Sequence, residues 1–397
     1  MRDRADDLGQ AGASRRAYLK MAGLGAAGLG TAALTSAWAA KSPPIETSTA
    51  LQANRNPGKL SSNENPWGPS PRAIEAMQRE IGFVNRYADE KAFEFVQQIA
   101  AQEGVDPEQV VIANGSTPIL RAFGEHVAAG GSGQVVTSMA TYEVIYRTVQ
   151  QYGGDVVFAP LATDMGYDLE GMASRISPRT TAVYVCNPNN PTGKALDPSV
   201  LSAFAIEAAK RAPVFIDEAY LNILKDYPAN SQTHLLRSGH NVVICRTFSK
   251  LHGLAGQRVG YALASKEIAK KLQHYDKTLG GATQPGLVNH LGMVAAMASS
   301  RDQAFIDTSR TRLAAGRSKL IAIARDSGRP IAEGSQTNFI WLDAGMSNLQ
   351  FADRMEAEGV LVVRRHWPEY ENWTRMCVGT DADIERCRAA MKKILKA

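Results

Sequence analysis

Short apolar runs alternate with helical stretches along most of the chain, and this alternation limits the fold more than any other feature of the sequence. The apolar runs are rich in β-branched residues and lie at 134–138, 156–159, 182–186, 214–217, 242–246 and 259–264. Amphipathic helical stretches lie before and between them, at 71–81, 92–103, 119–129, 144–152 and 199–211. Such a pattern predicts the α/β class, here a three-layer α/β/α domain with a mainly parallel sheet.

The pattern changes after about residue 284. Two long helical stretches at 286–299 and 302–326 are followed by short apolar runs and a closing helix, at 338–342, 360–363, 375–378 and 382–395. This order of elements predicts a smaller α+β domain. We therefore expect an N-terminal arm at residues 40–69, a large domain at residues 70–283 and a small C-terminal domain at residues 284–397.

The first 39 residues differ in kind from the rest. Arg15 and Arg16 precede a mildly apolar run rich in Ala and Gly, and Ala37-Trp38-Ala39 ends it with small residues of the kind a signal peptidase reads. The segment resembles a twin-arginine export signal, which predicts a periplasmic or secreted protein without stable membrane association after cleavage. The alternative is an uncleaved membrane anchor, which the glycines in the run disfavour.

Charge and cysteine usage exclude several classes of protein. The formal net charge is +5, from 44 Lys and Arg against 39 Asp and Glu, and no basic stripe indicates a nucleic-acid partner. The cysteines show no CxxC spacing, and we expect no metal site. Cys186 and Cys245 lie in runs that read as buried strands, whereas pairing of Cys377 with Cys387 stays open.

The segment around Lys250 carries the most specific chemistry. Lys250 follows an apolar run, with Thr247 and Ser249 just before it and Arg258 eight residues further on. Pyridoxal 5′-phosphate (PLP) enzymes need a lysine amine that condenses with the aldehyde of the cofactor and later moves protons. They also need hydroxyl groups and an arginine to hold a dianionic phosphate. Lys250 alone would read as a surface charge, but its neighbours favour a cofactor site.

Asp217 and Tyr220 form the second element of this site. Asp217 ends the apolar run 214–217, and ligands of open α/β sheets bind at the carboxyl ends of the strands. A carboxylate there keeps a pyridine nitrogen protonated, and Tyr220 is placed to reach the phenolic oxygen of the ring. The alternative for Asp217 is an ordinary helix cap.

Two further segments provide polar groups after strands. Asn190 lies in a turn dense in Asn, Pro and Gly, from which its amide can donate to a phenolic oxygen. Gly115, Ser116 and Thr117 precede a proline at a helix start, and the free N–H groups of such a start bind phosphate. Tyr142 follows the run 134–138 and is placed to stack on a cofactor ring, although a core or surface position is equally compatible.

Taken in order, these segments resemble the fold-type I PLP enzymes, in the class I and II aminotransferases. The resemblance covers about residues 55–395 and is closest to the histidinol-phosphate aminotransferase branch. It rests also on Leu60–Pro71, on Arg246–Lys250 with Leu254-Ala255-Gly256, on Asn338-Phe339 and on Arg375–Thr380. Each motif is weak alone, but the ordered set is specific.

The resemblance implies roles for particular residues. Lys250 would bind PLP covalently and act as acid and base, Asp217 would pair with the pyridinium nitrogen, and Tyr142 would stack on the ring. Arg375 would hold the α-carboxylate of the substrate. Tyr87 would reach the cofactor phosphate of the partner subunit in a homodimer. The phenolic oxygen would meet Asn190 and Tyr220, and the phosphate would meet Gly115, Ser116, Thr117, Thr247, Ser249 and Arg258.

The sequence departs from the family pattern at two places. Ala88 follows Tyr87 where the family usually has a proline. The run 362–367 does not align cleanly with the family, so that either Arg364 or Arg365 is the candidate for binding a second substrate anion, and Arg364 is our first choice. Nearby aromatic residues instead favour an aromatic or planar substrate, namely Trp367, Tyr370 and Trp373.

We therefore predict a PLP-dependent transaminase that moves an amino group from an amino acid or amine donor to a 2-oxo acid. An export signal argues for an unphosphorylated substrate, because phosphorylated biosynthetic intermediates belong inside the cell. The alternatives on the same fold are a lyase, a decarboxylase or an oxidase. A non-enzymatic PLP-binding module is disfavoured, because Lys250, Asp217 and Arg258 are all present.

Overall fold

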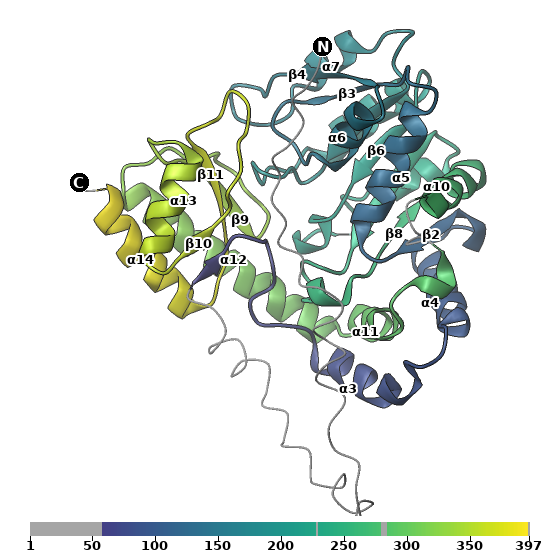
Figure 1. Ribbon diagram of the computed structural model, residues 1–397, viewed down its shortest axis with the longest axis horizontal. Coiled ribbons are helices and arrows are strands. Elements are labelled where there is room, and N and C mark those ends of the chain that lie inside the picture. The colour runs from purple at the N-terminus through teal and green to yellow at the C-terminus, as the bar shows by residue number, and fades with distance from the viewer. Residues whose placement is uncertain (1–57, 228, 279–283, 396–397) are drawn as a thin grey trace, which may run out of the picture. The chain divides into compact units, whose positions relative to one another are not determined.

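The computed structural model describes residues 58–227, 229–278 and 284–395. A seven-stranded sheet with the order β2-β8-β7-β6-β5-β3-β4 forms the centre of the large part of the chain (Figure 1). The strands are β2 (Val110–Ala113), β3 (Gln134–Ser138), β4 (Asp155–Ala159), β5 (Ala182–Cys186), β6 (Val214–Asp217), β7 (Val242–Thr247) and β8 (Gly260–Leu263). Only β8 runs antiparallel to its neighbours, β7 and β2. The predicted α/β class with a mainly parallel sheet is confirmed.

The sequence runs locate the sheet strands closely, with one exception. Strands β3, β5 and β6 have the predicted bounds, because their β-branched residues are buried on both faces of a parallel sheet. Strand β2 was not among the predicted runs, although all four of its residues are buried. A short apolar run without alternation reads equally well as a buried helical segment, so that only its pairing with β8 identifies it as a strand.

Helices connect and cover the strands. They are α3 (Pro71–Glu80), α4 (Asp89–Glu103), α5 (Ser116–Ala128), α6 (Val144–Gln151), α7 (Leu169–Arg175), α8 (Pro198–Ala209), α9 (Thr233–Arg237), α10 (Lys266–Thr278) and α11 (His290–Ser300). Single 3₁₀ turns are η1 (Ile81–Phe83), η2 (Pro107–Gln109), η3 (Leu221–Ile223), η4 (Ala255–Gln257) and η5 (Pro285–Leu287). Ser70 begins α3 by accepting a hydrogen bond from the Ala73 N–H at 3.0 Å, with Pro71 in the first turn.

A second group of elements follows α11 in the chain. Helix α12 (Gln303–Asp326) leads to the antiparallel pair β9 (Phe339–Asp343) and β11 (Trp373–Cys377), with α13 (Asn348–Ala357) and α14 (Asp381–Leu395) beside it (Figure 1). Strand β1 (Lys59–Leu60) pairs in parallel with β10 (Leu361–Val362). The N-terminal end of the described chain is therefore anchored to elements near its C-terminus.

Separate apolar cores lie in these two groups of elements. One side of the large sheet packs with α4, α8 and α11, whereas the core of the second group joins α12, α13 and α14 to β9 and β11. Residues of α11 such as Met293 thus belong to a core of the large sheet. Our segment boundaries at residues 69 and 283 stay predictions, and the predicted signal at residues 1–39 lies outside the described residues.

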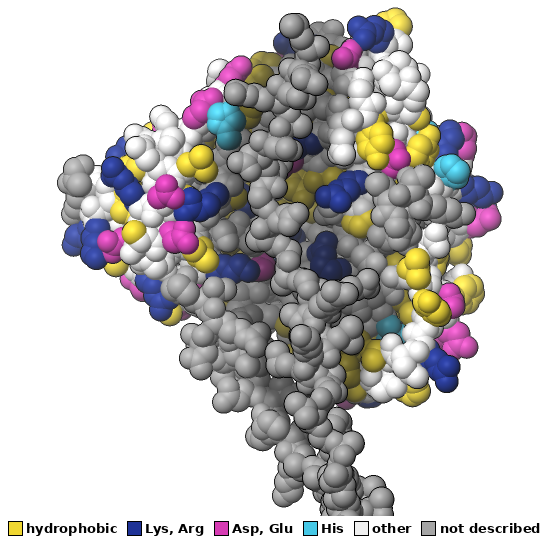
Figure 2. All heavy atoms as spheres, in the orientation of Figure 1, with side chains coloured by type: hydrophobic (Ala, Val, Ile, Leu, Met, Phe, Trp, Pro, Cys, Tyr) yellow, Lys and Arg dark blue, Asp and Glu magenta, His cyan; other side chains and the backbone are white. Residues whose placement is uncertain are grey.

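Surface charge and the cysteines complete the description. Basic and acidic side chains are interspersed over the elements that include α13 and α14 on the face shown in Figure 2. Lys393 of α14 forms an ion pair with Glu358. No helix in the described part of the chain is long and apolar enough to cross a bilayer. All four cysteines are buried and free, so Cys377 and Cys387 are unpaired in this structure.

Candidate active site

The carboxyl ends of three neighbouring parallel strands form the floor of the candidate site. Asp217, the last residue of β6, lies in register with Cys186 at the end of β5 and with Cys245 of β7. The loops that follow β5 and β7 carry Asn190 and Lys250, so that the sheet brings them to the same edge as Asp217. This edge is where open α/β sheets bind their ligands.

Asp217 is a buried carboxyl group whose hydrogen-bond donors are uncharged. Its Oδ1 accepts from the Ala219 N–H at 3.1 Å, and its Oδ2 accepts from the Tyr184 hydroxyl at 3.4 Å. Burial raises the pKa of Asp217 from 3.8 to about 7, because the ionised form loses its hydration. A cationic group placed against this carboxylate would therefore be strongly stabilised. Asp217 is 1 % exposed and is not the N-cap of the next helical turn, which begins after Tyr220.

Lys250 lies in the loop after β7, beside the ring of Tyr220. Its Nζ is 5.7 Å from the centre of that ring and donates to the carbonyl oxygen of Ser62 at 3.2 Å. Burial and the positive charge of Arg375 lower the pKa of Lys250 from 10.5 to about 8. A larger share of the amine is therefore neutral near neutral pH, which is the form that acts as a nucleophile.

Tyr220 follows β6, and its hydroxyl oxygen accepts from two amide groups. Asn63 Nδ2 lies 2.8 Å from this oxygen, and Asn190 Nδ2 lies 3.4 Å from it. Burial raises the pKa of Tyr220 above its ordinary value, so that the hydroxyl keeps its proton. The edge of its ring packs on Phe339 of β9, at 5.1 Å between ring centres.

Arg375 of β11 points into the same site. It donates from Nη1 to Asn190 Oδ1 and from Nη2 to the carbonyl oxygen of Ser61, each at 2.7 Å. Arg375 is 6 % exposed, and its Nε is buried without a hydrogen-bond partner among the described residues. An unpartnered donor on a buried guanidinium is an available site for a carboxylate.

The N-terminus of α5 and the β7–β8 connection form a polar cup. Gly115, with a φ of 88°, caps α5, and a Cβ at this position would lie 2.2 Å from Arg258 Nη2. Arg258 donates from Nη1 to Ser249 Oγ at 3.3 Å, and the Thr247 hydroxyl donates to the same oxygen at 2.9 Å. Ser116 lies in the first turn of α5, where free backbone N–H groups favour an anion.

Tyr142 lies between the polar cup, where it contacts Thr117, and the sheet edge that carries Asp217. It lies between β3 and α6, is mostly buried, and its hydroxyl hydrogen bonds with the Thr117 side chain. Burial and the nearby Asp217 carboxyl raise the pKa of Tyr142. Of the residues predicted for the site, the structure therefore brings together all except Tyr87 and Arg364.

Tyr87 and Arg364 lie elsewhere. Tyr87 is 82 % exposed and lines an open surface depression together with Asp89 and Lys270. Arg364 pairs with Asp353 at 2.5 Å and also with Glu356, both on α13. Among the described residues, no hydrogen bond or ion pair joins Arg364 to the site.

Arg365, the other candidate for binding an anion, lies on the side of the site. Its Nη2 donates to Glu143 Oε1 at 2.7 Å, and its charge acts on both Tyr142 and Arg375. Glu143 is the residue next to Tyr142 in the chain, and its other carboxylate oxygen pairs with Arg147 at 3.1 Å. The pair between Arg365 and Glu143 thus joins the loop before β11 to the start of α6.

The aromatic residues of that loop and of the start of β11 pack on Trp341. Trp341 of β9 is fully buried, and its ring centre lies 4.6 Å from Trp373, 5.1 Å from Tyr370 and 6.0 Å from Trp367. The same cluster includes Ala140, two residues before Tyr142. The aromatic cluster therefore packs against the segment that leads from Ala140 to Tyr142.

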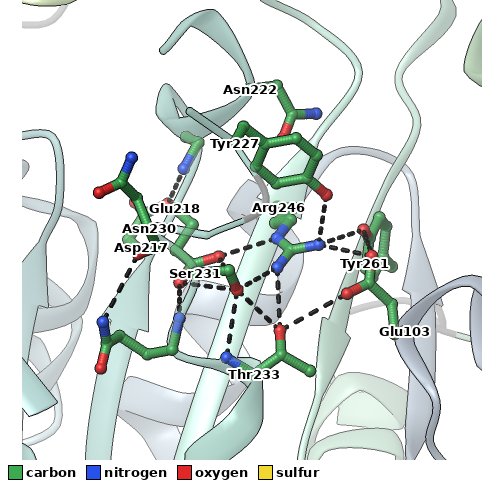
Figure 3. Close-up of polar contacts among 12 residues, drawn as sticks. Glu103, Asp217, Glu218, Asn222, Tyr227, Asn230, Ser231, Thr233, Arg246 and Tyr261 are labelled. Carbon is green, nitrogen blue, oxygen red and sulfur yellow. Dashed lines mark hydrogen bonds and ion pairs between the residues drawn. The ribbon is translucent and has the colours of Figure 1, made fainter. Parts of the chain in front are cut away.

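A buried ionic network around Arg246 lies next to the site residues Asp217 and Thr247 in the chain (Figure 3). Arg246 precedes Thr247 in β7 and is 1 % exposed. It donates to Glu218 at 2.9 Å and to Glu103 of α4 at 2.5 Å. Four hydroxyl groups complete its coordination, those of Tyr227, Tyr261, Ser231 and Thr233. Glu218 follows Asp217 directly, so the network fixes two strand ends that carry site residues.

Sequence reasoning missed four residues that contribute to the site. Asn63 and the carbonyl oxygens of Ser61 and Ser62 come from the arm beside β1, which the sequence marked only as part of a family motif. Tyr184 lies inside a buried strand and read as a core residue. The positive φ of Asn63, 54°, fits an asparagine, a residue type that adopts this conformation more readily than most. That preference is the one signal the sequence offered.

The polar groups of the site match those that the predicted cofactor needs. The buried Asp217 carboxyl lacks a directly bonded cation among the described residues, which suits a protonated ring nitrogen. In the cup the Arg258 guanidinium lies against Gly115 at the N-terminus of α5, so that guanidinium and N–H donors meet there, and Lys250 supplies an amine with a lowered pKa. The residues therefore fit PLP. No described group of three or more His, Cys, Asp or Glu side chains is arranged to hold a metal ion.

Comparison with known proteins assigns the family. The family model for aminotransferase class I and II matches residues 56–391. The chain belongs to the class I and II aminotransferases. It is 33 % identical over 339 residues to a histidinol-phosphate aminotransferase of Moorella thermoacetica, covering 85 % of each chain. It is also 33 % identical to an aromatic amino acid aminotransferase of Cutibacterium acnes, covering 86 % of this chain and 93 % of that one.

A solved structure agrees with this assignment. The histidinol-phosphate aminotransferase of Sinorhizobium meliloti, solved in complex with pyridoxal-5′-phosphate, superposes with a TM-score of 0.75 at 26 % identity, covering 87 % of this chain and 93 % of that one. The predicted aminotransferase fold and transaminase activity are confirmed. Neither the sequence relatives nor the structural neighbour favours the alternative of a lyase, a decarboxylase or an oxidase.

Proposed function

We propose that this aminotransferase uses PLP to move an amino group from an unphosphorylated amino acid or amine to a 2-oxo acid. The observation that carries the proposal is the convergence at one sheet edge of two buried groups and one partly buried amine. These are the Lys250 amine, the Asp217 carboxyl with a pKa of about 7, and the Arg375 guanidinium with a free Nε.

Each group has a role that follows from its surroundings. PLP, when bound, supplies an aldehyde for amine exchange and a ring that stabilises negative charge at the substrate α-carbon. Lys250 binds the cofactor and carries the proton to and from that carbon. Asp217 holds the ring nitrogen in its protonated form. Asn190 and Tyr220 would donate to the phenolic oxygen, and Tyr142 would lie against the ring.

The cup and Arg375 hold the two anionic ends. The N–H groups at the α5 N-terminus and the Arg258 guanidinium would hold the phosphate, and the lack of a Cβ at Gly115 lets Arg258 lie against the start of α5. The Ser116, Thr117, Thr247 and Ser249 hydroxyls surround this position. Arg375 binds the substrate α-carboxylate through its unpartnered Nε, and a held carboxylate favours transamination over decarboxylation.

An unphosphorylated substrate is supported by the pairing of Arg365. This is the cation beside Arg375 that a second substrate anion would need, and Glu143 already neutralises it at 2.7 Å. The preference for a planar side chain stays a prediction from the sequence, because Trp341, which packs with Trp373 at 4.6 Å between ring centres, is fully buried. The test is a panel of donors with the purified enzyme, scored by kcat/KM. Higher values for aromatic amino acids than for histidinol phosphate are expected, and a strong preference for histidinol phosphate contradicts the proposal.

A homodimer with shared sites is supported by an exposed apolar surface near Tyr87. Ile81, Phe83, Val84 and Phe93 are between 53 % and 66 % exposed, which is unusual for such side chains in a monomer. We infer that this surface meets a second copy, so that Tyr87 reaches the partner's cofactor phosphate.

The dimer is tested by complementation. Lys250→Ala and Tyr87→Ala variants are unfolded and refolded separately and as a mixture. Mixed dimers have one site with both residues intact, so the mixture regains activity that neither variant shows alone. No recovery in a mixture that has exchanged subunits contradicts the shared site.

Export through the twin-arginine pathway is supported by Arg15 and Arg16 before an apolar run. A cofactor loaded before export suits a pathway that carries folded proteins. Fusion of residues 1–45 to a reporter should direct it out of the cytoplasm, and Arg15→Lys with Arg16→Lys should retain it. Export that is indifferent to both arginines contradicts the proposal.

A further inference from the structure

We propose that Asn63 is a positioning residue that fixes the direction in which Tyr220 donates its hydroxyl proton. The inference rests on the proposed function, since the acceptor it requires is the phenolic oxygen of PLP. Asn63 Nδ2 lies 2.8 Å from the Tyr220 hydroxyl oxygen and is the closer of its two amide donors. Both residues are buried, with exposures of 1 % and 4 %.

The two amides together determine where the hydroxyl proton points. Asn190 is held by Arg375, which donates to its Oδ1 at 2.7 Å and so turns its Nδ2 toward Tyr220. A tyrosine oxygen that accepts from two N–H groups has no lone pair left to attract a third donor. Its own proton must then point away from Asn63 and Asn190, into the site.

The backbone around Asn63 is fixed independently of this side chain. Arg375 and Lys250 donate to the carbonyl oxygens of Ser61 and Ser62 at 2.7 and 3.2 Å. The Ser62 and Asn63 N–H groups hydrogen bond to Cys377. Asn63 itself has a φ of 54°, a conformation that Gly and Asp also tolerate. Replacement by these residues therefore changes the amide while leaving the backbone conformation accessible.

The readout is the pH at which the cofactor band of the resting enzyme changes from its long-wavelength to its short-wavelength form. A hydrogen bond donated to the phenolic oxygen stabilises the deprotonated form, and its loss moves the midpoint to higher pH. Four groups act electrostatically on Tyr220 or face it, and the variants leave them unchanged: Lys250, Arg375, Cys186 and Tyr142.

In Asn63→Gly the midpoint should rise by about 0.5 to 1 pH unit, which is the equivalent of one neutral hydrogen bond. Asn63→Asp should raise it further, because a carboxylate accepts the Tyr220 proton instead of donating to the oxygen. In a Tyr220→Phe background, Asn63→Gly should leave the midpoint unchanged. Circular dichroism checks that each variant is folded.

The outcomes separate this proposal from the proposed function. Absence of a cofactor band in the wild type would contradict the function itself. A normal wild-type band with an unchanged midpoint in Asn63→Gly would overturn only the role of Asn63. An equal shift in the Tyr220→Phe background would also overturn it, because the effect would then reach the cofactor without Tyr220. Wild-type behaviour of Asn63→Asp would show that the side chain is not a donor.

Discussion

The Arg246 guanidinium binds the Glu218 carboxylate at 2.9 Å beneath the sheet edge that carries the candidate site. Their neighbours in the chain, Thr247 and Asp217, face the site. Glu103, 143 residues away from Arg246 in the chain, completes the ion cluster from α4. Buried ion pairs thus connect the ends of β6 and β7 to helix α4.

Removal of the central cation should be costly. Arg246→Met leaves Glu103 and Glu218 buried without their cation, and we expect a loss of about 3 to 5 kcal/mol in the free energy of unfolding. Urea denaturation of the apoprotein measures this loss. The matched control is Arg179→Ala, which breaks an exposed pair with Asp155 and should cost less than about 1 kcal/mol. Equal losses in both variants would show that burial of the network has no special energetic role.

Asp217 should make the stability of the apoprotein depend on pH. Its pKa is about 7 in the folded protein against an ordinary value of 3.8, so the folded state binds the proton more tightly. The stabilising contribution is complete below pH 3.8 and is lost as the pH rises toward about 7. The loss approaches about 4 kcal/mol at high pH.

Asp217→Asn cannot ionise and should escape this loss. Urea unfolding of the apoprotein should show that the free energy of unfolding of the variant increases relative to that of the wild type as the pH rises from 3.8 to about 7. The same variant should bind PLP more weakly. Asp155→Asn, at an exposed position, is the control, and its stability relative to the wild type should not change over the same pH range. Parallel stability curves for Asp217→Asn and the wild type would contradict the assigned pKa.

Glu143 should control access of a second anion to Arg365. Glu143→Gln removes the neutralising charge at 2.7 Å, so kcat/KM for donors with an anionic side chain should rise about fivefold to tenfold relative to aromatic donors. The control is Glu356→Gln, which removes one of the two ion pairs of Arg364 and should leave the ratio unchanged. A ratio unaffected by Glu143→Gln would separate Arg365 from substrate selection.

The sequence predicted the sheet and the groups on its strand ends because both depend on local patterns. β-branched runs bounded by turn residues located β3, β5 and β6, and the residue type at each strand end indicated Asp217 and Lys250. Contacts between distant segments left no such pattern. Asn63 meets Tyr220 across 157 residues, and Arg365 meets Glu143 across 222. Arg364 and Arg365 are adjacent in one loop, and only the fold shows that Arg365 pairs with Glu143 whereas Arg364 pairs with α13.

The central claim is that Lys250 is the residue that binds the cofactor. The most direct test is reduction of the PLP-loaded enzyme with borohydride, followed by mass spectrometry of its peptides. We predict a phosphopyridoxyl group on the peptide that contains Lys250, and its loss together with the long-wavelength band in Lys250→Ala. A label on another lysine, or an unchanged band in Lys250→Ala, would contradict the account.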